Sequence, residues 1–232
     1  MGEEIPELPS IEIAENPKGE KATEKKDAGT NTSSKDFGNV FLRKDPPTEK
    51  ENNLRLILKD FEELHSNQRF ADVILKLGKH EFPAHKAILA SRSKVFEAMF
   101  EHDMLENRQH TVDLLDMEPD TVKDMLRYIY CGKVRELSPE ESLNLYIAAD
   151  RYDLQELVLH CRKIILNSLS IDNLFEVSTV ADLHNDQLLM DEVKSILCKD
   201  MKEILKTDQW ILFAKQNPIL SLDLIRSAIL NE

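Results

Sequence analysis

Two histidines and an aspartate near the first predicted strand are the first candidates for chemistry. His80 and His85 are five positions apart, and Asp72 lies upstream of both. A zinc site needs three or four ligands at suitable spacing, and no third or fourth ligand is present nearby in the sequence. Asp72 begins a predicted strand and His85 follows Pro83 and precedes a helix, so we expect a hydrogen-bonded network that fixes this strand–helix corner. The pattern predicts a structural role and no metal.

The sequence gives little support for a covalent catalytic site. Cys131 and His160 can be considered as a nucleophile and its base, but nothing in their surroundings supplies an oxyanion hole. No glycine-rich loop of a phosphate-binding type occurs. The acidic residues of DMEPD, residues 116–120, lack EF-hand spacing and fit the first turn of a helix instead. The sequence therefore predicts a protein that is not an enzyme and has no cofactor and no metal.

Composition favours a mostly helical protein with a real core. The chain has 232 residues, of which 41% are hydrophobic and only 6 are glycine. The formal charge of −13 disfavours non-specific binding to nucleic acid or to an anionic membrane, because both carry negative charge. No run approaches the roughly 18 apolar residues of a membrane span, and no charged-then-apolar leader opens the chain.

The three cysteines are Cys131, Cys161 and Cys198, spaced widely and without a CxxC motif. An odd and sparse set is typical of reduced thiols in an intracellular protein. Each cysteine lies on a predicted helix, where we expect it to act as a small apolar core residue.

Residues 1–50 differ from the rest of the chain. The stretch from Glu15 to Asp36 has almost no apolar residue and mixes both charges, which predicts a disordered tail. Two short apolar exceptions are Ile11–Ile13 and Phe37–Leu42, which reads FGNVFL. The second is open to three interpretations: a linear motif, an added strand, or a chance apolar patch beside a domain.

Order is expected to begin near Asn53 with a helix of about four turns. Its apolar residues recur at helical spacing and form one stripe: Leu54, Ile57, Leu58, Phe61 and Leu64. Because this helix comes before the first strand, no preceding strand is available whose sheet its apolar side would cover. The stripe therefore suggests a surface for a partner, with packing into the chain's own core as the alternative.

Residues 70–100 read FADVILKLGKHEFPAHKAILASRSKVFEAMF. Alternation predicts a half-buried strand at residues 73–77, a tight turn at Gly78-Lys79, and a second strand from His80 to Phe82 that Pro83 breaks. Two short helices are expected next, at 85–90 and 94–101. The predicted order is thus strand, turn, strand and two helices.

Further elements follow residue 100. A third strand is expected at 111–115, and Pro119 opens a helix that Gly132 ends in a left-handed cap. Ser138 and Glu141 form a capping box for the next helix. From about residue 170 the pattern is all helical, with helices after a cap at Ser170, at 186–205, at 208–215 and from Pro218. In the last helix Leu220, Leu224 and Ile229 are expected to face one way.

This order resembles the BTB/POZ domain, a protein-interaction module that usually dimerises. The stretches AHKAILASRSKVFEAMFEHDM, YIYCGKV and LNLYIAADRYD carry the resemblance, and the first is most similar to the speckle-type POZ (MATH-BTB) family. The implied fold is α+β: a short three-stranded sheet region with helices at 51–136, then an all-α BACK-like region at 137–232, after a disordered tail at 1–50.

The resemblance also implies site residues. The leading helix would pack against its twin in the dimer, which assigns dimerisation to the stripe from Leu54 to Leu64. Asp72 and His85 would be structural residues near the dimer cleft. Met104-Leu105-Glu106 matches the hydrophobic–X–Glu motif that inserts into a helical groove of the cullin-three scaffold. By analogy, Phe100, Tyr128 and the start of the 138–152 helix would join that contact.

The implied function is a substrate-specific adaptor of a cullin-three ubiquitin ligase, which promotes ubiquitination and proteasomal degradation of an unknown protein. Speckle-type adaptors carry a MATH β-sandwich ahead of the BTB domain, but only about 50 residues precede the leading helix here, against roughly 100 for a sandwich. Ile225 also replaces an aromatic residue of the relatives, which disfavours a second self-association through the last helices.

The alternative is a non-ligase dimerising module or a regulator that hetero-dimerises with full-length MATH-BTB adaptors. A transcription repressor and a channel tetramerisation domain are poorer fits, because neither zinc-finger Cys/His pairs nor a membrane span follow. The sequence leaves open the substrate, whether the tail holds a substrate receptor, homo- versus hetero-dimer, whether cullin binding is retained, and nucleus versus cytoplasm.

Overall fold

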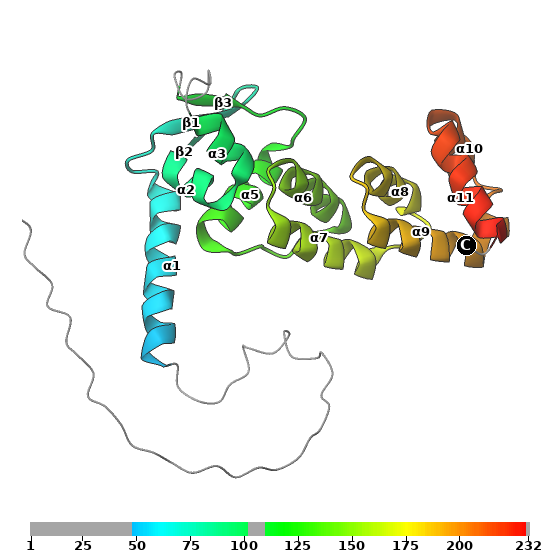
Figure 1. The fold of residues 1–232 in the computed structure, drawn as a ribbon, viewed down its shortest axis with the longest axis horizontal. Coiled ribbons are helices and arrows are strands. Elements are labelled where there is room, and N and C mark those ends of the chain that lie inside the picture. Colours follow the sequence, from blue (N-terminus) through cyan, green and yellow to red (C-terminus); the bar gives the residue numbers. More distant parts are fainter. Residues whose placement is uncertain (1–47, 102–109, 231–232) are drawn as a thin grey trace, which may run out of the picture. The chain divides into compact units, whose positions relative to one another are not determined.

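The computed structural model describes residues 48–101 and 110–230 (Figure 1). These form a small sheet with surrounding helices, followed by helices alone, as the α+β prediction requires. The strands are β1 (Val73–Leu77), β2 (His80–Ala84) and β3 (Thr111–Asp113). The helices are α1 (Glu49–Asn67), α2 (Lys86–Arg92), α3 (Lys94–Phe100), α5 (Pro119–Cys131), α6 (Pro139–Arg151), α7 (Gln155–Ser168), α8 (Leu174–Leu183), α9 (Gln187–Ile204), α10 (Asp208–Gln216) and α11 (Pro218–Leu230). The disorder predicted for residues 1–50 lies outside the described ranges up to residue 47, and it was wrong for residues 49 and 50, which belong to α1.

The three-stranded sheet has the order β2-β1-β3. β1 pairs antiparallel with β2 and parallel with β3, and its Val73 and Leu75 are buried as the alternation predicted. The predicted break at Pro83 was wrong, since β2 continues to Ala84 and Pro83 lies opposite Ile74. β2 is an edge strand, where a residue without an N–H is tolerated.

The sheet packs on helices that share one core with the rest of the described chain. α5 starts with Pro119 and ends at Gly132, whose φ of 64° is the predicted left-handed cap. Phe96 of α3 stacks on Tyr152 with ring centroids 4.6 Å apart, which connects the first short helices to the end of α6. From there the buried apolar residues continue through α7, α8 and α9 to Leu224 of α11.

Two helix starts differ from the predictions. α1 begins at Glu49, four residues before the predicted Asn53, because Thr48 and Glu51 form a capping box. Ser170 is not a helix cap. It donates its backbone N–H to Asn173 Oδ1 at 2.8 Å, so the local turn is made by Asn173 and α8 begins after it.

Two further predictions were wrong: that Cys198 is a core residue, and that Ile229 shares one face with Leu220 and Leu224. Cys198 is exposed, whereas Cys131 and Cys161 are buried. Ile229 is 64% exposed, while Leu224 is buried and Leu220 packs against the core. Ile229 lies about 140° around the helix from Leu224, so it faces away from the core that Leu224 and Ala228 pack on.

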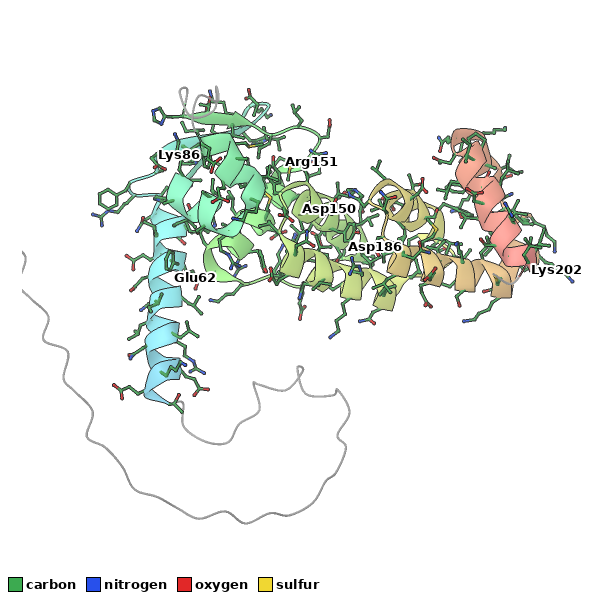
Figure 2. All side chains as sticks on the ribbon, viewed as in Figure 1. Glu62, Lys86, Asp150, Arg151, Asp186 and Lys202 are labelled. Carbon is green, nitrogen blue, oxygen red and sulfur yellow. The ribbon has the colours of Figure 1, made fainter. Side chains whose placement is uncertain are left out.

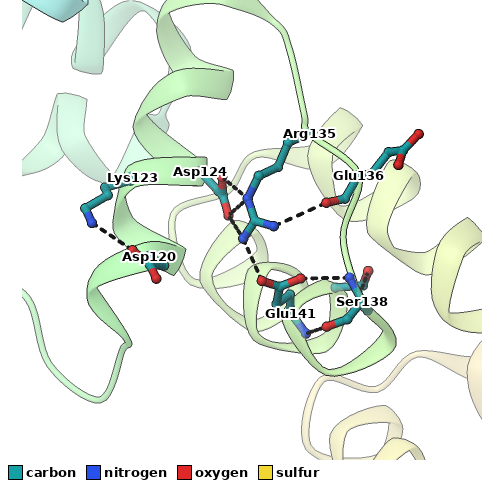
Figure 3. Close-up of polar contacts among 8 residues, drawn as sticks. Asp120, Lys123, Asp124, Arg135, Glu136, Ser138 and Glu141 are labelled. Carbon is teal, nitrogen blue, oxygen red and sulfur yellow. Dashed lines mark hydrogen bonds and ion pairs between the residues drawn. The ribbon is translucent and has the colours of Figure 1, made fainter.

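Arg135 connects α5 to α6 (Figure 3). Its Nε donates to both oxygens of Asp124 at 3.0 and 3.1 Å, and Nη2 donates to Glu141 at 2.8 Å. Glu141 also accepts the backbone N–H of Ser138 at 2.8 Å, which completes the predicted capping box. Arg135 thus fixes the loop and the first turn of α6 together.

We expect the carboxyl group of Glu141 to titrate abnormally. Hydrogen bonds from Arg135, then from Ser138, lower its pKa to about 2. Because a depressed pKa stabilises the fold above the unfolded value of about 4.3, this contribution is lost as the pH falls from there toward 2. Carbon-detected NMR titration should report a higher pKa for Glu141 in Arg135→Gln than in the parent, still below the ordinary value because the hydrogen bonds from Ser138 remain. Equal pKa values in the two proteins would contradict this role of Arg135.

Asp186 is the second polar junction, at the start of α9 (Figure 2). Its side chain is only 3% exposed and its Oδ2 accepts hydrogen bonds from Tyr146 Oη at 2.7 Å and Arg162 Nε at 2.6 Å. Its Oδ1 accepts the backbone N–H of Leu189 at 3.2 Å. One carboxylate therefore joins α6, α7 and α9.

Candidate protein-interaction surface

Helix α1 has an apolar face that the rest of the described chain does not cover. None of its residues is buried. Leu54 is 56% exposed, Ile57 51% and Phe61 37%, and Leu58 and Leu64 are half-buried. These five residues, called the α1 face below, are the predicted stripe. Among the described residues, Leu54, Ile57 and Phe61 do not pack into the chain's own core.

A groove runs beside the α1 face. It measures about 500 Å³ and is bounded by α1, α2 and α5. Its apolar lining includes Ile57, Leu58 and Phe61 of α1, Ala87 and Ile88 of α2, and Ile129 of α5. Exposed apolar patches next to concave apolar surface mark sites where proteins bind one another. We call this hollow the α1 groove.

Two contacts hold the C-terminal half of α1 to α5, which lies beside it (Figure 1). Glu62 Oε2 forms an ion pair with Lys133 Nζ at 2.8 Å, and the centroid of the His65 ring lies 4.9 Å from that of the Tyr130 ring. Burial, followed by repulsion from Arg127, lowers the pKa of His65, so the ring docks in its neutral form. The α1 face is thus presented by a helix fixed at one end.

At the corner where β2 leads into α2, Asp72 and His85 each form hydrogen bonds. Asp72 Oδ1 accepts the backbone N–H of Lys86 at 2.8 Å. His85 Nδ1 lies 2.6 Å from Tyr130 Oη, and His85 Nε2 lies 2.6 Å from the carbonyl oxygen of Arg69. Burial raises the pKa of Tyr130 to about 12. Sequence reasoning missed Tyr130, which is 45 positions from His85 and joins this corner to the α1 contact.

The remaining predicted residues lie elsewhere. Met104 and Glu106 fall outside the described residues. Phe100 ends α3 and is half-buried. Tyr128 is 8% exposed, and its ring lies 5.6 Å from the guanidinium carbon of Arg92.

The geometry of the described residues does not support catalysis by Cys131 or a metal site. Burial raises the pKa of Cys131, the opposite of what a nucleophilic thiol needs. Within residues 48–101 and 110–230, no three His, Cys, Asp or Glu side chains are grouped so as to hold a metal ion. In those same residues no helix is long and apolar enough to cross a membrane.

Comparison with known proteins finds a known domain that begins within α1, at residue 61. Residues 61–169, from α1 to α7, match the family model of the BTB/POZ domain. Among curated proteins, TD and POZ domain-containing protein 4 of Mus musculus is 39% identical over 169 residues, which cover 72% of this chain and 46% of that protein. The chain thus spans about half the length of this relative. Among solved structures, the BTB domain of zebrafish PATZ1 is 26% identical and gives a TM-score of 0.44 over 53% of this chain and 98% of that one. On the family match and the curated relative, this chain contains a BTB/POZ domain.

Proposed function

We propose that this protein is a dimerising adaptor subunit that connects a cullin-three ubiquitin ligase to a protein substrate. The observation that carries the proposal is the uncovered α1 face and its groove on a BTB/POZ domain, a kind of domain that serves protein interaction rather than catalysis. The dimer and the cullin contact are separate parts of the proposal, and each has its own support.

Dimerisation is supported by the shape and polarity of the α1 face. A second copy placed about a twofold axis would cover Leu54, Ile57 and Phe61 of both chains at once, because a symmetric interface uses the same patch twice. Stable homodimers bury about 2,000 Å² or more. The α1 face and the adjoining α1 groove offer apolar surface for such an interface.

Cullin binding is supported by the sequence motif Met104-Leu105-Glu106, which begins four residues after the last residue of α3 and resembles the hydrophobic–X–Glu motif of speckle-type adaptors. In this proposal Met104 enters an apolar groove of the scaffold and Glu106 supplies a hydrogen-bond acceptor beside it. Phe100, at the end of α3, and Tyr128, which is 8% exposed and lies against Arg92, would join the contact by analogy with the same adaptors. The helices after the BTB/POZ match would extend the contact.

The adaptor contributes no catalytic residue in this mechanism. The ligase scaffold holds the charged conjugating enzyme, and the adaptor holds the substrate, so that the transfer becomes effectively intramolecular. Two copies in one dimer would present two scaffolds and two substrate positions, which raises the effective concentration of substrate lysines near the enzyme.

The cullin contact is tested by calorimetry of the full chain with the N-terminal helical domain of the cullin-three scaffold. We expect a dissociation constant below about 1 μM, corresponding to roughly 8 kcal/mol of binding free energy. Met104→Ala/Glu106→Ala should abolish binding. Leu105→Ala, at the middle position of the same motif, is the matched control and should bind like the parent.

The alternative function is a dimerising regulator that pairs with full-length MATH-BTB adaptors and does not bind the scaffold. It is favoured by the α1 face, whose use does not depend on Met104 or Glu106. Absence of cullin binding in a protein that still dimerises would overturn the adaptor proposal and leave this regulator.

A further inference from the structure

The turn that connects α1 to β1 presents an aromatic side chain to the outside (Figure 1). Phe70 is 80% exposed, the highest value among the large apolar residues of the described chain. Its backbone has a φ of 62°, a left-handed conformation that is rare for a bulky residue. Such strain persists only where the surrounding structure imposes it, and strained residues are concentrated at functional sites. The exposure and the strain of Phe70 are together typical of a residue that binds a partner.

Hydrogen bonds on both sides of Phe70 impose this conformation. The backbone N–H of Gln68 donates to the Leu64 carbonyl oxygen at 3.1 Å, and that of Arg69 donates to Asn67 Oδ1 at 3.0 Å. The Arg69 carbonyl oxygen lies 2.6 Å from His85 Nε2. Because a carbonyl oxygen only accepts, Nε2 of His85 carries the proton in this contact. The turn is therefore held in place before any partner binds.

The surroundings of the Phe70 ring adjoin the α1 face. A hollow of about 220 Å³ lies between the ring and the last turns of α1. Its other lining residues are Asp60, Glu63, Leu64, Asn67 and Arg69. Leu64 belongs to the α1 face as well, so the surface around Phe70 continues that face beyond the end of the helix.

The area that a dimer requires indicates what covers Phe70. Stable homodimers bury about 2,000 Å² or more, which is about 1,000 Å² from each copy. The three most exposed side chains of the α1 face are only 37–56% exposed. Even a fully buried aromatic side chain contributes about 150–250 Å², so the α1 face supplies a few hundred Å² per copy. A dimer interface must therefore extend past the α1 face, and Phe70 is an exposed apolar side chain that adjoins it.

We propose that Phe70 is an anchor of the dimer interface and that a second copy of this chain covers its ring. This inference rests on the proposed dimerisation and adds a residue outside the α1 face on which the dimer depends. A side chain whose backbone is already fixed loses little conformational freedom when a partner covers it, which favours binding. Aromatic residues are also enriched among those that contribute most to binding at protein interfaces.

The experiment compares the full chain with Phe70→Asn by analytical ultracentrifugation over a concentration series. Asparagine tolerates the left-handed conformation, so the substitution removes the ring without adding backbone strain. We expect the dimer dissociation constant to rise at least about 25-fold, because the dimer contains the ring twice and two fivefold losses multiply. Phe70→Tyr retains the ring and should match the parent. The matched control is Leu183→Asn at the end of α8, which alters a side chain that is 71% exposed and should also match the parent.

Phe70→Trp gives a direct readout of the position of the ring. The single tryptophan of the chain, Trp210, is 8% exposed, so a new indole at position 70 is the one expected to change its environment. We expect the fluorescence emission to move to shorter wavelength as the dimer forms, at the same protein concentrations at which ultracentrifugation detects the dimer.

The outcomes separate this inference from the proposed function. If the parent dimerises, an unchanged dissociation constant in Phe70→Asn or an unchanged emission of Phe70→Trp overturns the role of Phe70 and leaves the dimer standing. A parent that stays monomeric overturns the proposed dimer and this inference with it. Calorimetry with the cullin-three domain covers the other occupant: if Phe70→Asn weakens that binding and leaves the dimer unchanged, the ring binds the scaffold and the inference fails.

Discussion

Ile57→Asp is expected to turn the dimer into a monomer at micromolar concentration, with the dissociation constant raised by more than about 100-fold. Ile57 is 51% exposed in the single chain, so the substitution removes apolar area that only a partner covers. A symmetric dimer contains the change twice. Two losses of about 1.5 kcal/mol each amount to about 3 kcal/mol, or about two powers of ten, before the cost of desolvating the new carboxylates.

The matched control is Leu56→Asp. Leu56 is 59% exposed and adjacent to Ile57, but it is turned by about 100° around the helix, outside the α1 face. Analytical ultracentrifugation should show a normal dimer for this variant and monomer for Ile57→Asp, with equal thermal unfolding of the monomers. A dimer that tolerates Ile57→Asp would place the self-association elsewhere and contradict the proposed interface.

Asp186→Ala is expected to destabilise the fold by about 3–5 kcal/mol, the cost of leaving one member of a buried charge pair without its partner. The change would remove the acceptor for the Tyr146 hydroxyl, the ion pair with Arg162 and the cap of α9 at once. Urea unfolding measures the difference. Asp191→Ala, an exposed aspartate on the same helix, should change the free energy of unfolding by less than about 0.5 kcal/mol.

The contribution of Asp186 should also depend on pH. Burial by itself raises the pKa of its carboxyl group, but hydrogen bonds from Tyr146, the Leu189 amide and Arg162 outweigh burial and lower it. A carboxyl whose folded pKa is depressed adds stability above its unfolded pKa of about 3.9, and that stability is lost as the pH falls through the folded value. The gap in unfolding free energy between the parent and Asp186→Asn should therefore narrow below about pH 4. A gap that stays constant to pH 2 would contradict the ionised state of Asp186.

Local signals accounted for much of the fold. The alternation in β1, the Gly78-Lys79 turn, Pro119 and Gly132 around α5, and the capping box at Ser138 are all governed by residues within a few positions of one another. For the same reason the sequence located the α1 face, since helical spacing is a local property.

Features that depend on residues far apart in the sequence could be seen only in the tertiary structure. Pro83 continues a strand because β2 lies at the sheet edge, and an edge is defined by the order of strands, not by local sequence. Cys198 and Ile229 have the residue types of a core, yet the packing of α9 and α11 leaves them exposed.

The α1 groove depends partly on local sequence and partly on the tertiary structure. The sequence by itself determined that α1 has an apolar stripe, because periodicity within one helix fixes which residues share a face. It could not determine that α2 and α5 border that stripe with a hollow, nor that Tyr130 would join His65 to His85 across the chain. Those relations arise when elements far apart in sequence bury their apolar surface together, and only the folded chain decides which surfaces remain uncovered.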